Sequence, residues 1–127
     1  MKNSNFKAEN FFKSQGYARN GLRLIFKNER NFKIHLSIAI LVIIAGFVLK
    51  ISYQDWIAVS LVISMVLISE TMNSAVEAVC DTISQEYKVN IKYAKDVSAG
   101  AVLLSVFVSI ITGIIVFTPY ILKIFRF

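Results

Sequence analysis

Four acidic or amide side chains recur at helical spacing along one stretch of the chain. Glu70, Asn73, Glu77 and Asp81 are spaced i, i+3, i+7 and i+11, which places them within about 80° of one helical face. The residues around them are largely apolar. Carboxylates at or inside a membrane boundary are costly, so they usually face a bundle interior, pair with other groups and mark function. We therefore predict a functional polar face along this helix.

Side chains of this kind suit phosphoryl transfer with a divalent cation. In nucleotide sites Mg²⁺ takes one or two carboxylates, while phosphates and water complete its shell, which predicts Glu29 and Glu77 as metal ligands. A further carboxylate orients or deprotonates the attacking hydroxyl. Glu70 lies deepest in the apolar stretch and is the predicted catalytic base. Lys95 and Asp96 are predicted to lie near the phosphates.

The spacing leaves two other kinds of function open. The polar face would also suit an ion or proton pathway in a small membrane subunit. A less favoured alternative is a surface that holds helices or a partner protein together, with Lys95 as counter-ion. Glu29 favours phosphoryl transfer over conduction, because a conduction path has no need of an acid outside the spans. The sequence holds no P-loop, kinase glycine loop or HRD-type motif, so spacing alone does not identify the reaction.

Transmembrane helices are predicted to position these side chains. The sequence is 56% hydrophobic with a mean hydropathy of +0.61, outside the usual range for soluble domains. Residues 97–122 carry no charge and exceed the roughly 20 residues that cross a bilayer. Only a short link precedes the second span, which predicts a helical hairpin with Asp55 as N-cap. We predict an all-α integral membrane protein with one domain over residues 1–127 and spans at about 33–50, 55–85 and 95–123.

The segment before the first span is predicted to be an amphipathic surface helix over about residues 5–30. Basic and apolar side chains form separate stripes at the helical period. The basic stripe holds Arg19, Arg23, Lys27 and Arg30, and the apolar stripe holds Phe11, Ala18, Leu22 and Ile25. Continued at the same period, Glu29 falls within the apolar stripe, so its carboxylate should point toward the protein or the bilayer.

The charge distribution predicts where the chain lies. Its net charge is +6, and eight of its 14 Lys and Arg residues precede the first span, which indicates an anionic membrane surface and not nucleic acid. Three more basic residues lie between the second and third spans. By the positive-inside rule the N-terminus is cytoplasmic. We predict a multi-pass membrane protein. The single cysteine allows no internal disulfide.

Specific motifs resemble the prokaryotic diacylglycerol kinase family. ETMNSAVEAVCD at 70–81 and AKDVSAGAV at 94–102 are similar to its signature, and the similarity extends back through NERNFKIH at 28–35 to GYARNGLR, which begins at Gly16. The resemblance implies a homotrimer with active sites shared between subunits, and Mg²⁺ and ATP bound without a common kinase fold.

The resemblance also implies roles for individual residues. The position of Glu70 is the proton acceptor, Glu29 and Glu77 hold the metal, and Asn73 and Asp81 shape the site. The positions that match nucleotide contacts are Tyr17, Glu29, Glu77, Glu86, Tyr87, Lys88, Lys95 and Asp96. One departure is visible at Asn10, where the diacylglycerol-specific branch carries a ligand-contacting arginine.

The substrate predicted from the resemblance is a lipid alcohol. The ERNFKIH stretch at 29–35 is similar to the Gram-positive branch, whose main substrate is undecaprenol. We expect transfer of the ATP γ-phosphate to undecaprenol, giving undecaprenyl phosphate for recycling of the cell-wall lipid carrier. Diacylglycerol, giving phosphatidic acid, is the alternative substrate, and a small ion-conducting or proton-conducting subunit is the alternative without enzymatic activity.

Overall fold

The computed structural model describes residues 11–84, 86 and 88–125, which form four α-helices. They are α1 (Phe11–Asn28), α2 (Arg30–Leu49), α3 (Tyr53–Ile83) and α4 (Val89–Phe125). Three of them, α2, α3 and α4, are long and apolar enough to cross a membrane. The expectation of an all-helical chain with three long apolar helices is confirmed.

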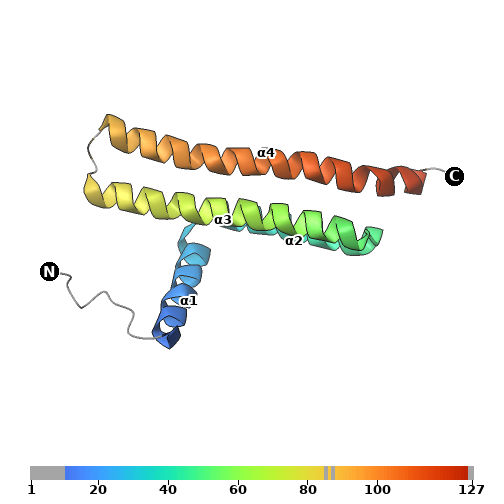
Figure 1. Ribbon diagram of the computed structural model, residues 1–127, viewed down its shortest axis with the longest axis horizontal. Helices are drawn as coiled ribbons and strands as arrows, with labels where there is room; N and C mark the ends of the chain where they lie inside the picture. Colours follow the sequence, from blue (N-terminus) through green and yellow to red (C-terminus); the bar gives the residue numbers. More distant parts are fainter. Residues whose placement is uncertain (1–10, 85, 87, 126–127) are drawn as a thin grey trace.

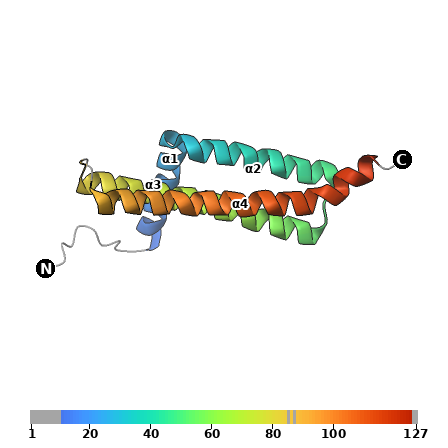
Figure 2. The ribbon, with the colours of Figure 1, turned by 90° about the horizontal axis from the view of Figure 1, so that it is seen from above.

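The three long helices run side by side, and α1 leaves them at a steep angle (Figures 1 and 2). α3 and α4 are antiparallel neighbours along most of their length. α2 is the shortest of the three, with 20 residues against 31 in α3 and 37 in α4. The hairpin of α3 and α4 therefore extends past the start of α2 (Figure 1). The corner between α1 and α2 consequently meets α3 part-way along its length.

The corner between α1 and α2 is a sharp break at one residue. Glu29 adopts an extended conformation with φ −91° and ψ 112°, whereas the predicted helix extended to about residue 30. The Lys33 ammonium donates to the Lys27 carbonyl at 2.9 Å, which satisfies an acceptor at the end of α1. The rings of Phe26 and Phe32 meet edge to face with centroids 5.2 Å apart. These contacts, and not the period of a continuous helix, set the direction of Glu29.

The turn between α2 and α3 closes the opposite end of the bundle. Lys50 adopts a left-handed conformation with φ 52°, and the Ile51 N–H donates to the Gly46 carbonyl at 3.2 Å, the pattern of a Schellman cap. The N-cap of α3 is Ser52, whose hydroxyl accepts from the Asp55 N–H. The prediction of Asp55 as N-cap was wrong, because Asp55 lies in the first turn of the helix.

A hydrogen-bonded group joins this turn to α4. The Tyr120 hydroxyl donates to the Asp55 carboxylate at 2.5 Å and accepts from the Ser52 N–H at 2.8 Å. Beside it, Ile51, Val59 and Val116 form a small buried cluster. The far end of α4 is thereby held against the hairpin of α2 and α3, which fixes how the helices are aligned at their other end.

We predict that Gly46 is needed for the α2–α3 hairpin. A Cβ on Gly46 would lie 2.8 Å from the Trp56 ring, so Gly46→Ala forces the helices apart at an expected cost of about 1–3 kcal/mol. Unfolding by SDS, followed by the fluorescence of Trp56, the single tryptophan, measures this cost. Gly113→Ala is the control, because nothing in this chain lies within 4 Å of its added Cβ. Equal stability of the two variants would contradict the prediction.

Candidate active site

Glu70 is the most buried acidic side chain in the described residues, with 3% of its surface exposed. It lies on α3, opposite the corner between α1 and α2. The Asn31 side chain is its hydrogen-bond partner from α2, and His35, Glu77 and Glu29 lie close enough to influence its carboxyl group. Two further acids and a histidine therefore lie near Glu70. One acid is on the same helix, the other is at the α1–α2 corner, and the histidine is on α2.

Asn73 lies one turn further along α3 and is also buried, with 7% exposed. Its amide donates to the Glu77 carboxylate at 3.1 Å. The Ser98 hydroxyl of α4 donates to the amide oxygen of Asn73 at 2.7 Å. Glu77 is itself half-buried. Glu70, Asn73 and Glu77 of the predicted polar face thus point inward, toward the α1–α2 corner and α4, whereas Asp81 is exposed.

A second polar group lies near the loop between α3 and α4. The Lys95 ammonium donates to the Asp81 carboxylate at 2.5 Å, and Lys92 forms an ion pair with Asp96 one turn away on α4. The two pairs line an open hollow of about 390 Å³. Its other lining residues are Ser84, Glu86, Lys88 and Ile91. In the loop, the Glu86 N–H donates to the Ser84 hydroxyl at 3.1 Å.

The two polar groups are spread along α3. Eleven residues separate Glu70 from Asp81, which corresponds to about 16 Å of helix. A single metal ion cannot contact both ends over that distance, since metal–oxygen bonds are about 2 Å long. The arrangement therefore suits an extended ligand, with its reacting end at Glu70 and its other end at the hollow.

The remaining predicted site residues are less constrained. Tyr17 is exposed on α1, and the described residues give it no hydrogen bond or ring contact. Glu86 and Lys88 are exposed in the loop. Tyr87, predicted as a nucleotide contact, and Asn10, the departure from the family pattern, lie outside the described residues.

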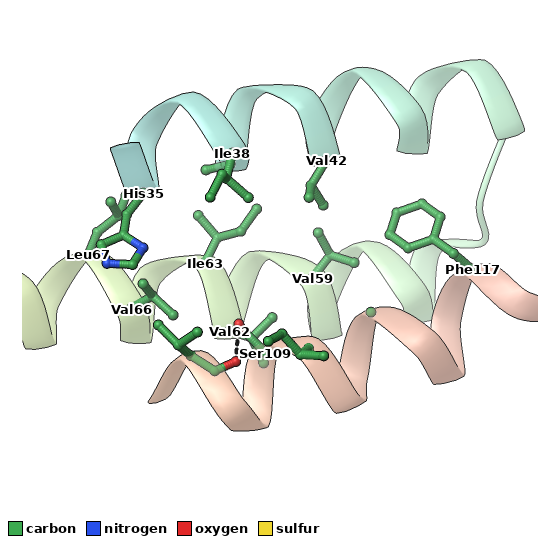
Figure 3. A pocket seen from close by; sticks show the side chains of 14 residues that line it. His35, Ile38, Val42, Val59, Val62, Ile63, Val66, Leu67, Ser109 and Phe117 are labelled. Carbon is green, nitrogen blue, oxygen red and sulfur yellow. Dashed lines mark hydrogen bonds between the residues drawn. The ribbon is translucent and has the colours of Figure 1, made fainter. Parts of the chain in front are cut away.

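An apolar cavity of about 310 Å³ opens between α2, α3 and α4 (Figure 3). His35 lies at one end and Phe117 at the other (Figure 3). The side chains between them are almost all aliphatic. Val66 and Leu67 line the cavity at the same end as His35 (Figure 3), and Glu70 follows them on α3, so the buried acid lies just beyond this end. Such a shape accepts an apolar chain that carries one polar end.

The donor set around Glu70 is compatible with a nucleotide-bound Mg²⁺. No group of three His, Cys, Asp or Glu side chains that would hold a metal occurs within residues 11–84, 86 and 88–125, so an all-protein metal cage is absent from this part of the chain. Mg²⁺ in nucleotide sites needs only one or two carboxylates, because phosphates and water supply the rest. Glu29 and Glu77, which both act on Glu70, would provide that number.

Sequence reasoning missed four residues that the structure adds to these groups: Asn31, His35, Lys92 and Ser98. Asn31 and His35 are spaced i, i+4 in the first turns of α2, and this spacing beside Glu29 was an available signal. Lys92 likewise precedes Asp96 by four residues. Ser98 carried no signal, since its contact with Asn73 spans 25 residues of sequence.

Comparison with known proteins identifies the family. Residues 16–117 match the family profile described as prokaryotic diacylglycerol kinase. The undecaprenol kinase of Bacillus subtilis is 36% identical over 109 residues, which cover 86% of this chain and 89% of that protein. The chain belongs to the prokaryotic diacylglycerol kinase family. It is therefore a membrane-bound lipid kinase. This assignment replaces two earlier alternatives, an ion or proton pathway and a surface that only holds helices or a partner protein together.

Other relatives of this kinase are named for a different substrate, diacylglycerol. The diacylglycerol kinase of Escherichia coli K12 is 33% identical over 100 residues, covering 79% of this chain and 82% of that protein. The diacylglycerol kinase of Synechocystis is 37% identical over 107 residues, covering 84% of this chain and 61% of that protein. The family assignment is thus secure, while both lipid alcohols occur among the relatives.

Proposed function

We propose that this kinase transfers the γ-phosphate of ATP to undecaprenol at Glu70. The observation that carries the proposal is the position of this acid. It is buried on α3 just beyond Val66 and Leu67, which line the His35 end of the apolar cavity, and Glu29 and Glu77 lie close enough to act on it. A lipid chain in the cavity would bring its hydroxyl to this end. Phosphates held by the two flanking acids through a metal would approach the same point.

Glu70 is the proposed general base. As the lipid oxygen forms its bond to the γ-phosphorus, the bond from phosphorus to the bridging oxygen of ADP breaks, and the hydroxyl proton passes to the carboxylate. The Asn31 side chain orients Glu70 from α2. The aliphatic walls of the cavity exclude water, which would otherwise compete with the lipid hydroxyl for the phosphoryl group.

Glu29 and Glu77 are the proposed ligands of Mg²⁺. A bound Mg²⁺ would neutralise charge on the phosphates during transfer. The extended backbone at Glu29 leaves its side chain free of any capping hydrogen bond. Glu77 is held by Asn73 through one oxygen, so its other oxygen remains available.

The hollow at the α3–α4 loop is the proposed nucleotide site. Lys95 and Asp96 are its central contacts, with Asp81 shaping it and Glu86, Tyr87, Lys88 and Tyr17 as further contacts. The Lys95 ion pair with Asp81 is partly exposed, and such pairs stabilise a protein by only about 0–1 kcal/mol. Lys95 can therefore exchange this partner for phosphate oxygens at little cost.

Undecaprenol is the proposed acceptor, and diacylglycerol is the second candidate. The Bacillus subtilis relative, named an undecaprenol kinase, aligns over the largest share of both chains among the three relatives described above. The diacylglycerol kinases of Escherichia coli and Synechocystis support the alternative at similar identity. The aliphatic lining discriminates between lipid tails by small increments per methylene, so the headgroup end carries most of the selectivity.

The proposed setting is a bacterial plasma membrane with the N-terminus and the α3–α4 loop in the cytoplasm, where ATP is available. α1 is proposed to lie in the membrane surface, since it carries exposed basic side chains beside exposed apolar ones such as Phe11 and Leu22. We further propose a single domain that assembles as a homotrimer, with neighbouring subunits completing each active site. The many exposed apolar side chains of α2, α3 and α4 support both lipid and subunit contacts.

Glu70→Gln is expected to lower lipid phosphorylation by at least about a thousandfold, because an amide cannot accept the hydroxyl proton. The purified protein in detergent is given undecaprenol, Mg²⁺ and labelled ATP, and label is counted in the organic extract. Asp55→Asn is the matched control, since it removes a charge from the other end of the same helix while the amide oxygen can still accept from the Tyr120 hydroxyl. Full turnover by Glu70→Gln with an intact oligomer would rule out the proposed base.

The preferred substrate is tested by a side-by-side comparison in one detergent. We expect kcat/KM to be larger for undecaprenol than for diacylglycerol. A ratio of about tenfold in favour of diacylglycerol would exceed the small increments expected from tail packing and would reverse the assignment.

A further inference from the structure

Three side chains form a hydrogen-bonded series that runs from α4 to the proposed metal ligand. The Ser98 hydroxyl lies 2.7 Å from the amide oxygen of Asn73, and the Asn73 amide nitrogen lies 3.1 Å from a carboxylate oxygen of Glu77. Asn73 is buried, and Ser98 and Glu77 are half-buried. The series is therefore poorly reached by water, which makes each hydrogen bond in it more important.

The chemistry of the three groups fixes their donor and acceptor roles. An ionised carboxylate only accepts hydrogen bonds, so the side of Asn73 that faces Glu77 must be its NH₂ group. The amide oxygen of Asn73 then faces Ser98, and the hydroxyl must donate to it. Ser98 has an alternative acceptor, the Lys95 carbonyl at 2.9 Å, but a donation to that carbonyl alone would leave the buried amide oxygen unpaired.

We propose that Ser98 is a positioning residue that orients Glu77 through Asn73. This inference rests on the proposed role of Glu77 as a ligand of Mg²⁺. Without the Ser98 hydroxyl, the amide oxygen of Asn73 loses its partner on α4, and within the described residues the hydrogen bond to Glu77 is the only side-chain hydrogen bond left to fix the plane of the amide. The amide could then turn about its side-chain bonds, and the carboxylate of Glu77, which it holds, would lose its fixed orientation.

The other serines of α4 do not reach across to α3. Ser105 and Ser109 donate to carbonyls of their own helix, at Val102 and Val106. Ser105 is as buried as the α3 site residues, with 4% exposed. A change at Ser105 therefore removes the same hydroxyl from the same helix without touching the series, which makes it a matched control.

The test measures Mn²⁺ binding by electron paramagnetic resonance in detergent with ADP, beside the Mg²⁺ dependence of turnover. Residues that support a metal ligand typically change metal affinity by about tenfold or more. We expect Ser98→Ala to raise the half-saturating Mn²⁺ concentration by about that factor. Ser98→Thr, which keeps the hydroxyl, should restore binding, and Ser105→Ala should leave it unchanged. In the Asn73→Ala background, Ser98→Ala should have no further effect.

Two outcomes would overturn the inference and can be told apart. If Glu77→Gln weakens Mn²⁺ binding but Ser98→Ala does not, Ser98 has no positioning role, and the proposed metal ligand stands. If Glu77→Gln leaves Mn²⁺ binding unchanged, the role of Glu77 in the proposed function fails as well. A loss of thermal stability in Ser98→Ala without a change in Mn²⁺ binding belongs to the first outcome, because a purely structural contact would produce it.

Discussion

Burying a carboxyl group among apolar helices costs free energy unless polar groups surround it. The buried Glu70 therefore requires polar neighbours, and the rest of the fold has to supply them. These polar neighbours come from several parts of the chain. Asn31 and His35 approach from α2, Glu77 follows on α3, and Glu29 lies at the corner before α2. Three of these neighbours are available only because the chain reverses direction at the α2–α3 turn and returns past its own corner.

The corner between α1 and α2 determines which groups meet Glu70. A continuous helix would carry Glu29 at a regular angle along a single axis. The break at Glu29 instead ends α1, and the edge-to-face contact of Phe26 with Phe32 holds the two helices at a steep angle. As a result, a basic helix leaves the bundle part-way along α3 (Figure 1), and the acid of the corner lies close enough to act on Glu70.

The polar face of α3 differs in character between its two ends, and the proposed transfer uses both. Its deep end is acidic and adjoins an apolar cavity, which suits a lipid alcohol. Its far end pairs Asp81 with Lys95 in an exposed hollow, where a charged ligand can displace the ion pair. Between the two ends, Asn73 connects Glu77 to α4. Catalysis by positioning requires such a rigid connection, because phosphoryl transfer depends on alignment and charge neutralisation.

The sequence by itself determined the helices, the inward polar face of α3 and the family. These properties are local: hydropathy over about 20 residues predicts a span, helical period places Glu70, Asn73 and Glu77 on one face, and the motifs at 70–81 and 94–102 are contiguous. Tertiary structure decided the meeting of Glu29 with Glu70, the contact of Ser98 with Asn73 and the bond of Tyr120 to Asp55. Each of these contacts joins residues that are far apart in the sequence. Whether such residues meet depends on turn geometry and helix packing, which the periodic pattern of a single helix does not predict.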